Sequence, residues 1–245
     1  MDKLHSGTGN QTRIHESKSD NQTSLKPHTR RGYGRKTRKW NYPQNHNLSA
    51  IGTNSDGLNT KKESLFYLVN KLRPSIITIQ ETKFTHYGTL KIPGYEVFEH
   101  LRVDKKDGGL LTAILSDLNP AIVDSDIDVE LLIVQVNIGN LKIRVFNGYG
   151  PQEDDNINKI NSFWQTVEQE ILNAKEEGCL IIIQMDANAK IGQAHIKEDP
   201  YLTSNNGKIL LDIVSRQGML IGNADTKCMG LREKKESVVR LKIVY

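Results

Sequence analysis

Apolar side chains recur along this chain at two spacings, which separate the predicted helices from the predicted strands. Recurrence every three or four residues predicts helices at residues 61–73, 156–177 and 205–218. In the longest of these, Phe163 and Trp164 fall on the apolar face, which predicts that both belong to the core.

Short apolar or alternating runs predict the strands between these helices. They cover residues 47–54, 75–80, 95–98, 109–115, 120–124, 129–137, 141–149 and a run that starts at 179. Gly139-Asn140 indicates a tight hairpin between two of them. Many strands with a few helices among them predict a mixed α/β domain whose strands are buried on at least one face.

Residues 1–46 lack both spacings. They hold ten Lys/Arg against three Asp/Glu and almost no aliphatic side chains, so we expect a disordered basic tail, followed by one domain over 47–245. The stretch "KPHTRRGYGRKTRKW" interleaves Tyr33 and Trp40 with cations that could bind nucleic-acid phosphates and bases. The predicted nucleic-acid contacts are Arg30, Arg31, Arg35, Lys36, Arg38 and Lys39. A solvated tail without a partner is the alternative.

Composition narrows the class of protein. The 245 residues carry 33 Lys/Arg and 29 Asp/Glu, and no apolar run approaches the length of a membrane span, so we expect no membrane association. Cys179 and Cys228 form neither a disulfide framework nor a zinc-binding spacing. We therefore expect an intracellular protein.

Polar side chains recur where several predicted strands end. Any one of them would ordinarily be a turn former or a helix cap. Their repetition suggests that the strand ends share one rim, and side chains two apart on an extended chain point the same way. The residues are Asn54 and Asp56, Glu81, Asn147 and Tyr149, and Asp186 and Asn188.

Three carboxylates at one rim would repel one another unless a cation lies between them. All the candidate ligands are carboxylate or amide oxygens, which favour Mg²⁺ or Mn²⁺ over Zn²⁺. Such a site, with a tyrosine hydroxyl beside it, suits the hydrolysis of phosphate esters.

The order "TNSDGL … IITIQETK … GGLLTAI … RVFNGYGPQ … IIIQMDANAKIG" resembles the endonuclease/exonuclease/phosphatase superfamily. It is most similar to the apurinic-type endonuclease domains of non-LTR retrotransposons, over residues 47 to about 225. The resemblance implies a four-layer α/β sandwich of two packed mixed β-sheets flanked by helices.

The resemblance also implies roles for individual residues. Glu81 and Asp56 would be metal ligands. A catalytic set would contact the phosphate or orient the attacking water, and it comprises Asn54, Tyr149, Asp186 and Asn188. Asn206 would line the site.

The sequence departs from the family in two places. Thr53 replaces the tryptophan that precedes the first asparagine, and the family's terminal Asp-His pair has no counterpart, since His195 is the last of seven histidines. The terminal histidine stabilises charge on the phosphate in the family. We therefore expect a domain that is incomplete at its C-terminus, lacks its last strands and has weak or no activity.

Three functions stay open on the sequence alone. The first is a Mg²⁺-dependent DNA endonuclease of retrotransposon origin, located in the nucleus and associated with a reverse transcriptase domain in the parent element. The second is a catalytically dead remnant that binds nucleic acid. The third is a phosphatase-type relative acting on a small phosphate ester.

Overall fold

The chain divides into two units, residues 1–44 and 45–245, and the structure, a computed structural model, describes parts of the second. The described residues are 48–102, 108–123, 129–191 and 203–222. The predicted tail at 1–46, its six basic contact residues and the sequence after residue 222 lie outside them.

The first sheet has the strand order β1-β2-β4-β3. β1 (Ala50–Asn54) and β2 (Ile76–Gln80) run parallel, while β4 (Leu110–Leu115) is antiparallel to both β2 and β3 (Tyr95–His100). Every residue of β2 and β4 is buried, because both faces of these central strands are covered.

The second sheet has the order β5-β6-β7-β8. β5 (Ala121–Ile122), β6 (Leu131–Ile138) and β7 (Leu141–Tyr149) are antiparallel, and β8 (Leu180–Asp186) pairs in parallel with β7. The 20-residue helix α2 (Ile157–Glu176) makes the crossover that this parallel pair needs.

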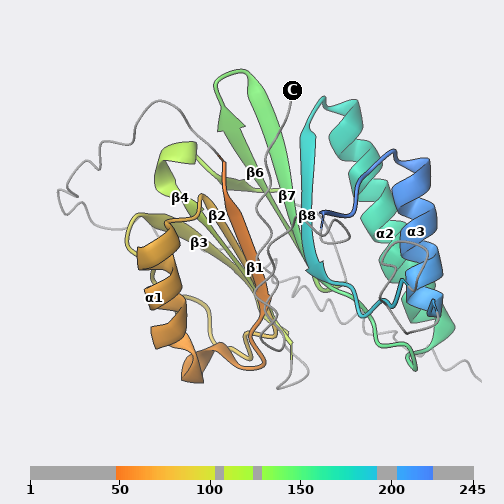
Figure 1. Ribbon diagram of the computed structural model, residues 1–245, viewed down its shortest axis with the longest axis horizontal. Coiled ribbons are helices and arrows are strands. Elements are labelled where there is room, and N and C mark those ends of the chain that lie inside the picture. The colour runs from red at the N-terminus through yellow and green to blue at the C-terminus, as the bar shows by residue number, and fades with distance from the viewer. Residues whose placement is uncertain (1–47, 103–107, 124–128, 192–202, 223–245) are drawn as a thin grey trace, which may run out of the picture. The chain divides into compact units, whose positions relative to one another are not determined.

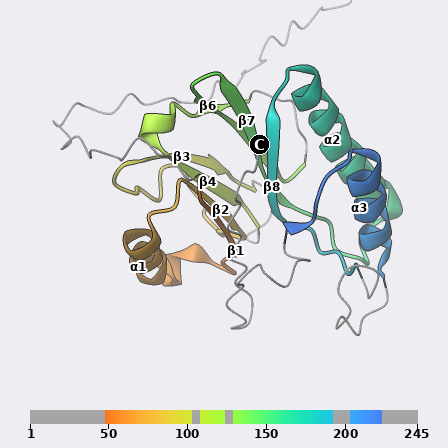
Figure 2. The same ribbon diagram turned by 45° about the horizontal axis from the view of Figure 1, so that its top comes forward.

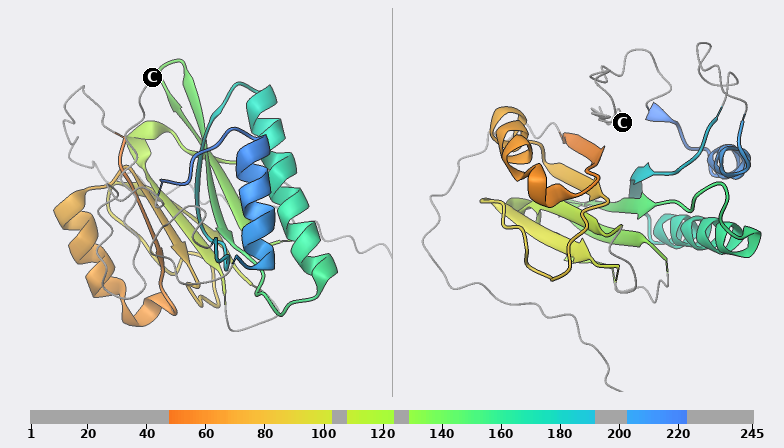
Figure 3. Two further views of the ribbon diagram at one scale, coloured as in Figure 1. Left: turned by 45° about the vertical axis from the view of Figure 1, so that its right-hand side comes forward. Right: turned by 90° about the horizontal axis from the view of Figure 1, so that it is seen from below.

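Helices cover the outer faces of the two sheets (Figures 1 and 2). α1 (Lys62–Leu72), which follows the short 3₁₀ helix η1 (Leu58–Thr60), packs on the first sheet through Leu65 and Val69. α2 and α3 (Asn205–Arg216) pack on the second sheet, where Phe163 and Trp164 meet edge to face with ring centroids 5.2 Å apart. The 90° view in Figure 3 shows the layers in the order helix, sheet, sheet, helices. The predicted four-layer sandwich and the core role of both aromatics are confirmed.

The side chains between the two sheets change in character along the strands. At one end the gap is filled by buried aliphatic side chains such as Ile76, Ile114, Val134 and Val145. The next positions along the same strand faces are buried but polar, and the carboxylates and amides of the strand ends come last. The candidate site therefore lies at one end of the inter-sheet gap, on top of a packed core.

Most predicted elements lie within two residues of their observed bounds. Two strands are shorter than expected: β1 starts at Ala50 rather than at 47, and the stretch 120–124 yields the two-residue β5. Both residues of β5 are exposed, so this edge strand gains little stability from burial that would make it longer. A 3₁₀ turn, η2 (Ser116–Leu118), separates it from β4.

Candidate active site

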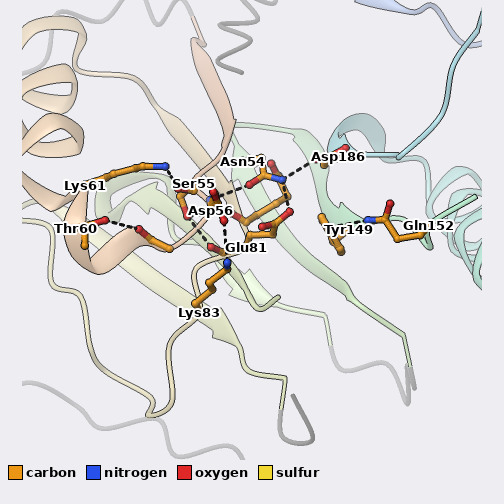
Figure 4. Close-up of polar contacts among 12 residues, drawn as sticks. Asn54, Ser55, Asp56, Thr60, Lys61, Glu81, Lys83, Tyr149, Gln152 and Asp186 are labelled. Atoms are coloured by element: carbon orange, nitrogen blue, oxygen red, sulfur yellow. Dashed lines mark hydrogen bonds and ion pairs between the residues drawn. The ribbon is translucent and has the colours of Figure 1, made fainter. Parts of the chain in front are cut away.

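Residues from both sheets meet at the polar end of the gap (Figure 4). Asn54 is the last residue of β1, and Glu81 directly follows β2. Tyr149 and Asp186 end β7 and β8, where they are partners in the parallel register. Residues that are 132 positions apart in sequence thus come into direct contact.

The Asn54 amide joins the two carboxylates. Its Nδ2 donates to Glu81 Oε1 at 2.7 Å and to Asp186 Oδ2 at 2.7 Å. Its Oδ1 accepts the backbone N–H of Asp56 at 3.0 Å, which fixes which side of the amide faces the carboxylates. A single neutral amide group therefore donates hydrogen bonds to two carboxylates, one from each sheet.

Glu81 reaches this position because the backbone turns at the end of β2. Gln80 faces the inter-sheet gap, so strand alternation would direct the next side chain to the opposite face. Instead Glu81 has φ 52°, in the left-handed region that non-glycine residues rarely adopt. The Ser55 hydroxyl donates to Glu81 O at 2.8 Å, and the Gly57 N–H donates to the same oxygen at 2.8 Å. These bonds offset the strain of a conformation that costs about 1–3 kcal/mol.

Tyr149 lies beside the carboxylates. Burial, followed by the hydrogen bond to Glu81 and its negative charge, raises the pKa of Tyr149 to about 12, and the charge of Asp186 adds to this effect. A hydrogen bond with Asn188 acts in the opposite direction, and Gln152 Nε2 donates to the phenol oxygen at 3.0 Å. At neutral pH the phenol is therefore protonated and can act as a donor.

Asn188 ties the end of β8 to the loop after β7. It has φ 46°; its backbone N–H donates to Asp186 Oδ1 at 3.3 Å, and its Nδ2 donates to Gly150 O at 2.7 Å. The Gly150 N–H in turn donates to Asp186 O at 2.7 Å. A Cβ on Gly150 would lie 2.5 Å from Ala187 O, so only glycine fits this approach.

Asn206, at the start of α3, is fully buried behind this loop. It accepts a hydrogen bond from Trp164 Nε1 at 2.8 Å and donates to Pro151 O at 2.8 Å and Asn188 O at 3.3 Å. Asn206 therefore supports the backbone of the loop, and its bond with Trp164 links the loop to the core.

Asp56 does not join the Glu81/Asp186 pair, contrary to the expectation that Asn54 and Asp56 point to one side. Its φ of 44° ends the strand geometry on which that expectation rests. The carboxylate, 51% exposed, forms an ion pair with Lys83 Nζ at 2.8 Å. Its backbone N–H still serves the site by orienting Asn54.

The donor set determines which cation fits. Within the described ranges no group of three or more His, Cys, Asp and Glu side chains could hold a metal, and neither Glu81 nor Asp186 forms an ion pair with a lysine or arginine there. Two carboxylates with a phenol oxygen beside them suit Mg²⁺, which commonly binds through one or two carboxylates and keeps its remaining positions for water and phosphate. A structural zinc site is excluded for these residues by the lack of nitrogen and sulfur donors.

Sequence reasoning overlooked the buried Gln80 and Gln184, and it placed Asn147 at the rim rather than beneath it. Gln80, Asn147 and Gln184 are at most 6% exposed, and all three face the inter-sheet gap. The available signal was a polar residue at alternating positions within otherwise apolar strands.

Among the helices in the described part of the chain, none has the length and apolar character that a membrane span requires.

Comparison of the sequence with protein-family models and with curated proteins gave no match. Solved structures are similar in fold. The AP endonuclease of Leishmania major aligns with a TM-score of 0.56 at 15% identity, covering 76% of this chain and 71% of that one. The endonuclease domain of TRAS1, a telomere-specific non-LTR retrotransposon, aligns with a TM-score of 0.54 at 17% identity, covering 79% and 82%. The 3′-5′ exonuclease of Neisseria meningitidis aligns with a TM-score of 0.52 at 13% identity, covering 69% and 71%. This chain has the fold of the endonuclease/exonuclease/phosphatase superfamily, as its ordered motifs predicted.

Proposed function

We propose that the chain is a Mg²⁺- or Mn²⁺-dependent phosphodiesterase of the DNA endonuclease type. The observation that carries this proposal is the meeting of Glu81, Asp186 and Asn54 at 2.7 Å contacts across two sheets. Two acidic groups held this close, with only an amide between them, form a strong anionic field that a divalent cation would neutralise.

Glu81 and Asp186 would hold the cation, with Asn54 beside them. When bound, the cation supplies charge neutralisation for the phosphoryl oxygens of the substrate. Asp56 has a different part in the proposal: its ion pair with Lys83 and its N–H bond to Asn54 keep the amide in place.

The remaining polar groups would act on the phosphate and the attacking water. Asp186 Oδ1 accepts the backbone N–H of Asn188, which orients the carboxylate to accept a proton from water. The Tyr149 phenol, protonated at neutral pH, would donate to a phosphate oxygen as negative charge develops. Asn188, in contact with Tyr149, would keep the phenol in position.

DNA is the proposed substrate because two of the similar structures are described as an AP endonuclease and a retrotransposon endonuclease domain. The basic stretch at 26–40 supports the same choice, since cations bind phosphate backbones. A retrotransposon origin, a reverse transcriptase partner and a nuclear location follow as parts of this proposal.

A nicking assay tests the proposal. Supercoiled plasmid, with and without abasic sites, would be incubated with the full chain in Mg²⁺ and in EDTA. Glu81→Gln and Asp186→Asn should each reduce nicking by about 10² or more, whereas Glu96→Gln, at an exposed position of β3, should leave it unchanged. Equal nicking by all four proteins would mean that the cleavage does not come from this site.

Two further results separate the alternatives. DNA binding without nicking in any metal would favour the binding remnant. Deletion of residues 1–46 should flatten the salt dependence of DNA binding if these residues provide the phosphate contacts. Release of phosphate from a small ester, without plasmid nicking, would favour the phosphatase-type alternative.

A further inference from the structure

A layer of buried polar side chains separates the candidate site from the apolar part of the inter-sheet gap. It consists of Thr78 and Gln80 on β2, Thr112 on β4, Asn147 on β7 and Gln184 on β8, all at most 6% exposed. Asn147 and Gln184 are partners in the β7/β8 register, directly below the Tyr149/Asp186 pair. On β7 and β8 the layer lies one strand repeat beneath the site, and on β2 it reaches the level of Asn54 through Gln80.

Hydrogen bonds in this layer run between the two sheets. Gln80 Nε2 donates to Asn147 Oδ1 at 2.6 Å, and Asn147 Nδ2 donates to Leu111 O at 2.8 Å and Thr112 Oγ1 at 3.2 Å. A second connection runs from Thr78 Oγ1 to Gln184 Oε1 at 3.2 Å. Asn147, on the second sheet, therefore contacts both central strands of the first.

Such bonds constrain the sheets in a way that apolar contacts do not. Burial against aliphatic side chains is non-directional and tolerates small sliding movements, whereas a hydrogen bond weakens steeply when its geometry changes. A buried amide that lost its partner would cost about 1–3 kcal/mol. One arrangement of the two sheets is thus favoured, the one that satisfies the Gln80 and Asn147 amides.

The site depends on this arrangement because its parts come from both sheets. Asn54 and Glu81 belong to the first sheet, and Asp186 and Tyr149 to the second. Gln80 precedes Glu81 and is the register partner of Asn54, while Asn147 is two residues before Tyr149. The Gln80–Asn147 bond is therefore a buried cross-sheet contact beside the Asn54–Asp186 contact: Gln80 is level with Asn54, and Asn147 lies one strand repeat below Tyr149.

We propose that Gln80 and Asn147 are positioning residues, whose hydrogen bond fixes the two sheets at the offset that brings Asn54 and Glu81 to Asp186. The part of the proposal that is tested by metal affinity rests on the proposed function. The part that is tested by the position of the Asn54 amide rests on geometry alone. In this proposal, two neutral, buried side chains align the charged side chains of the site.

The test replaces both amides by apolar side chains of similar shape, Gln80→Met with Asn147→Leu. Removing both partners together leaves neither amide unsatisfied, so the melting temperature should fall less than it does when either amide is replaced alone. Affinity for Mn²⁺, measured by calorimetry, should fall 10- to 100-fold, as is typical when a group that orients metal ligands is lost. The exchange variant, Gln80→Asn with Asn147→Gln, keeps one amide on each sheet and should recover part of the affinity.

A control separates positioning from stability. Val145, fully buried in the apolar part of the same gap, makes no such bond; Val145→Ala should lower the melting temperature and leave Mn²⁺ affinity within about twofold. If the Met/Leu variant loses no more affinity than Val145→Ala, or if the exchange variant recovers none, the positioning role is wrong.

A second readout needs no metal. The Asn54 side-chain amide, which donates to two carboxylates, should give a displaced ¹H–¹⁵N signal, assigned by its loss in Asn54→Ser. This signal should move toward ordinary asparagine values in the Met/Leu variant and stay in place in Val145→Ala. Failure of the wild-type chain to bind Mn²⁺ would contradict the proposed function, whereas an unmoved Asn54 signal would contradict the positioning role.

Discussion

The ionisation of Tyr149 is the most direct electrostatic consequence of the site. Burial and the neighbouring Glu81 raise its pKa to about 12, from an ordinary value of 10.0. Replacing Glu81 with Gln removes the negative charge, so the pKa should fall, though not to 10, because burial is the largest cause and persists. Asp186→Asn should lower it less, since Asp186 acts through charge alone and is the smallest contribution.

The shift also predicts the sign of a stability change. A phenol whose pKa is higher in the folded chain than in the unfolded chain leaves stability unaffected below pH 10 and destabilises the fold as pH rises from 10 to 12. A rise of the Tyr149 pKa from 10.0 to about 12 corresponds to about 2.7 kcal/mol at full burial, which partial solvent contact at this site reduces to about 1–2 kcal/mol. Tyr149→Phe should lack this loss.

The assay is a phenolate titration by absorbance at 295 nm. The chain has eight tyrosines, so the signal of Tyr149 has to be isolated. For each protein, the curve measured with Tyr149→Phe added would be subtracted from the curve measured without it. The wild-type difference should have its midpoint near pH 12, and Glu81→Gln should move that midpoint down. A wild-type midpoint near 10, or no response to Glu81→Gln, would mean that the phenol and the carboxylate do not interact as described.

Three other substitutions give separate tests. Asn54→Asp should lower the melting temperature without metal, by placing three carboxylates together, and should enlarge the rise on adding Mn²⁺; an unchanged rise would contradict the ligand set. Asn206→Ala removes the bonds to Trp164 and Pro151 and should cost about 1–3 kcal/mol in chemical denaturation, with a smaller value contradicting its supporting role. Gly207→Ala would place a Cβ 1.9 Å from Lys190 O, so it should destabilise the fold by about 2 kcal/mol or more in chemical denaturation. An unchanged free energy of unfolding would show that the loop around Lys190 can move to make room.

Apolar spacing was sufficient to predict the helices and strands, polar strand ends predicted the rim, and the resemblance of the ordered motifs supplied the four layers. Apolar spacing distinguishes α2 from β8, and the strand ends that carry Tyr149 and Asp186 fall at the same level because β7 and β8 pair in register. The buried faces of Phe163 and Trp164 follow from the same rule.

The details of the site could not be predicted, because they depend on single backbone turns. Alternation along an extended chain would place Asn54 with Asp56 and turn Glu81 away from the gap. Left-handed φ values at Asp56 and Glu81 reverse both outcomes, since the chain leaves strand geometry at these residues. Asn147 shows the same limit: a polar residue inside a strand indicates burial next to a partner, but the partner, Gln80, is 67 residues away in sequence.

The proposed function requires that Glu81 and Asp186 bind one divalent cation together. Anomalous diffraction from crystals soaked in Mn²⁺ would test it most directly. We expect one strong peak within coordination distance of both carboxylates, with the Asn54 amide displaced from its bridging position, and no peak there in crystals of Glu81→Gln. A peak at some other place with none between these two side chains, or no difference between the two proteins, would contradict it.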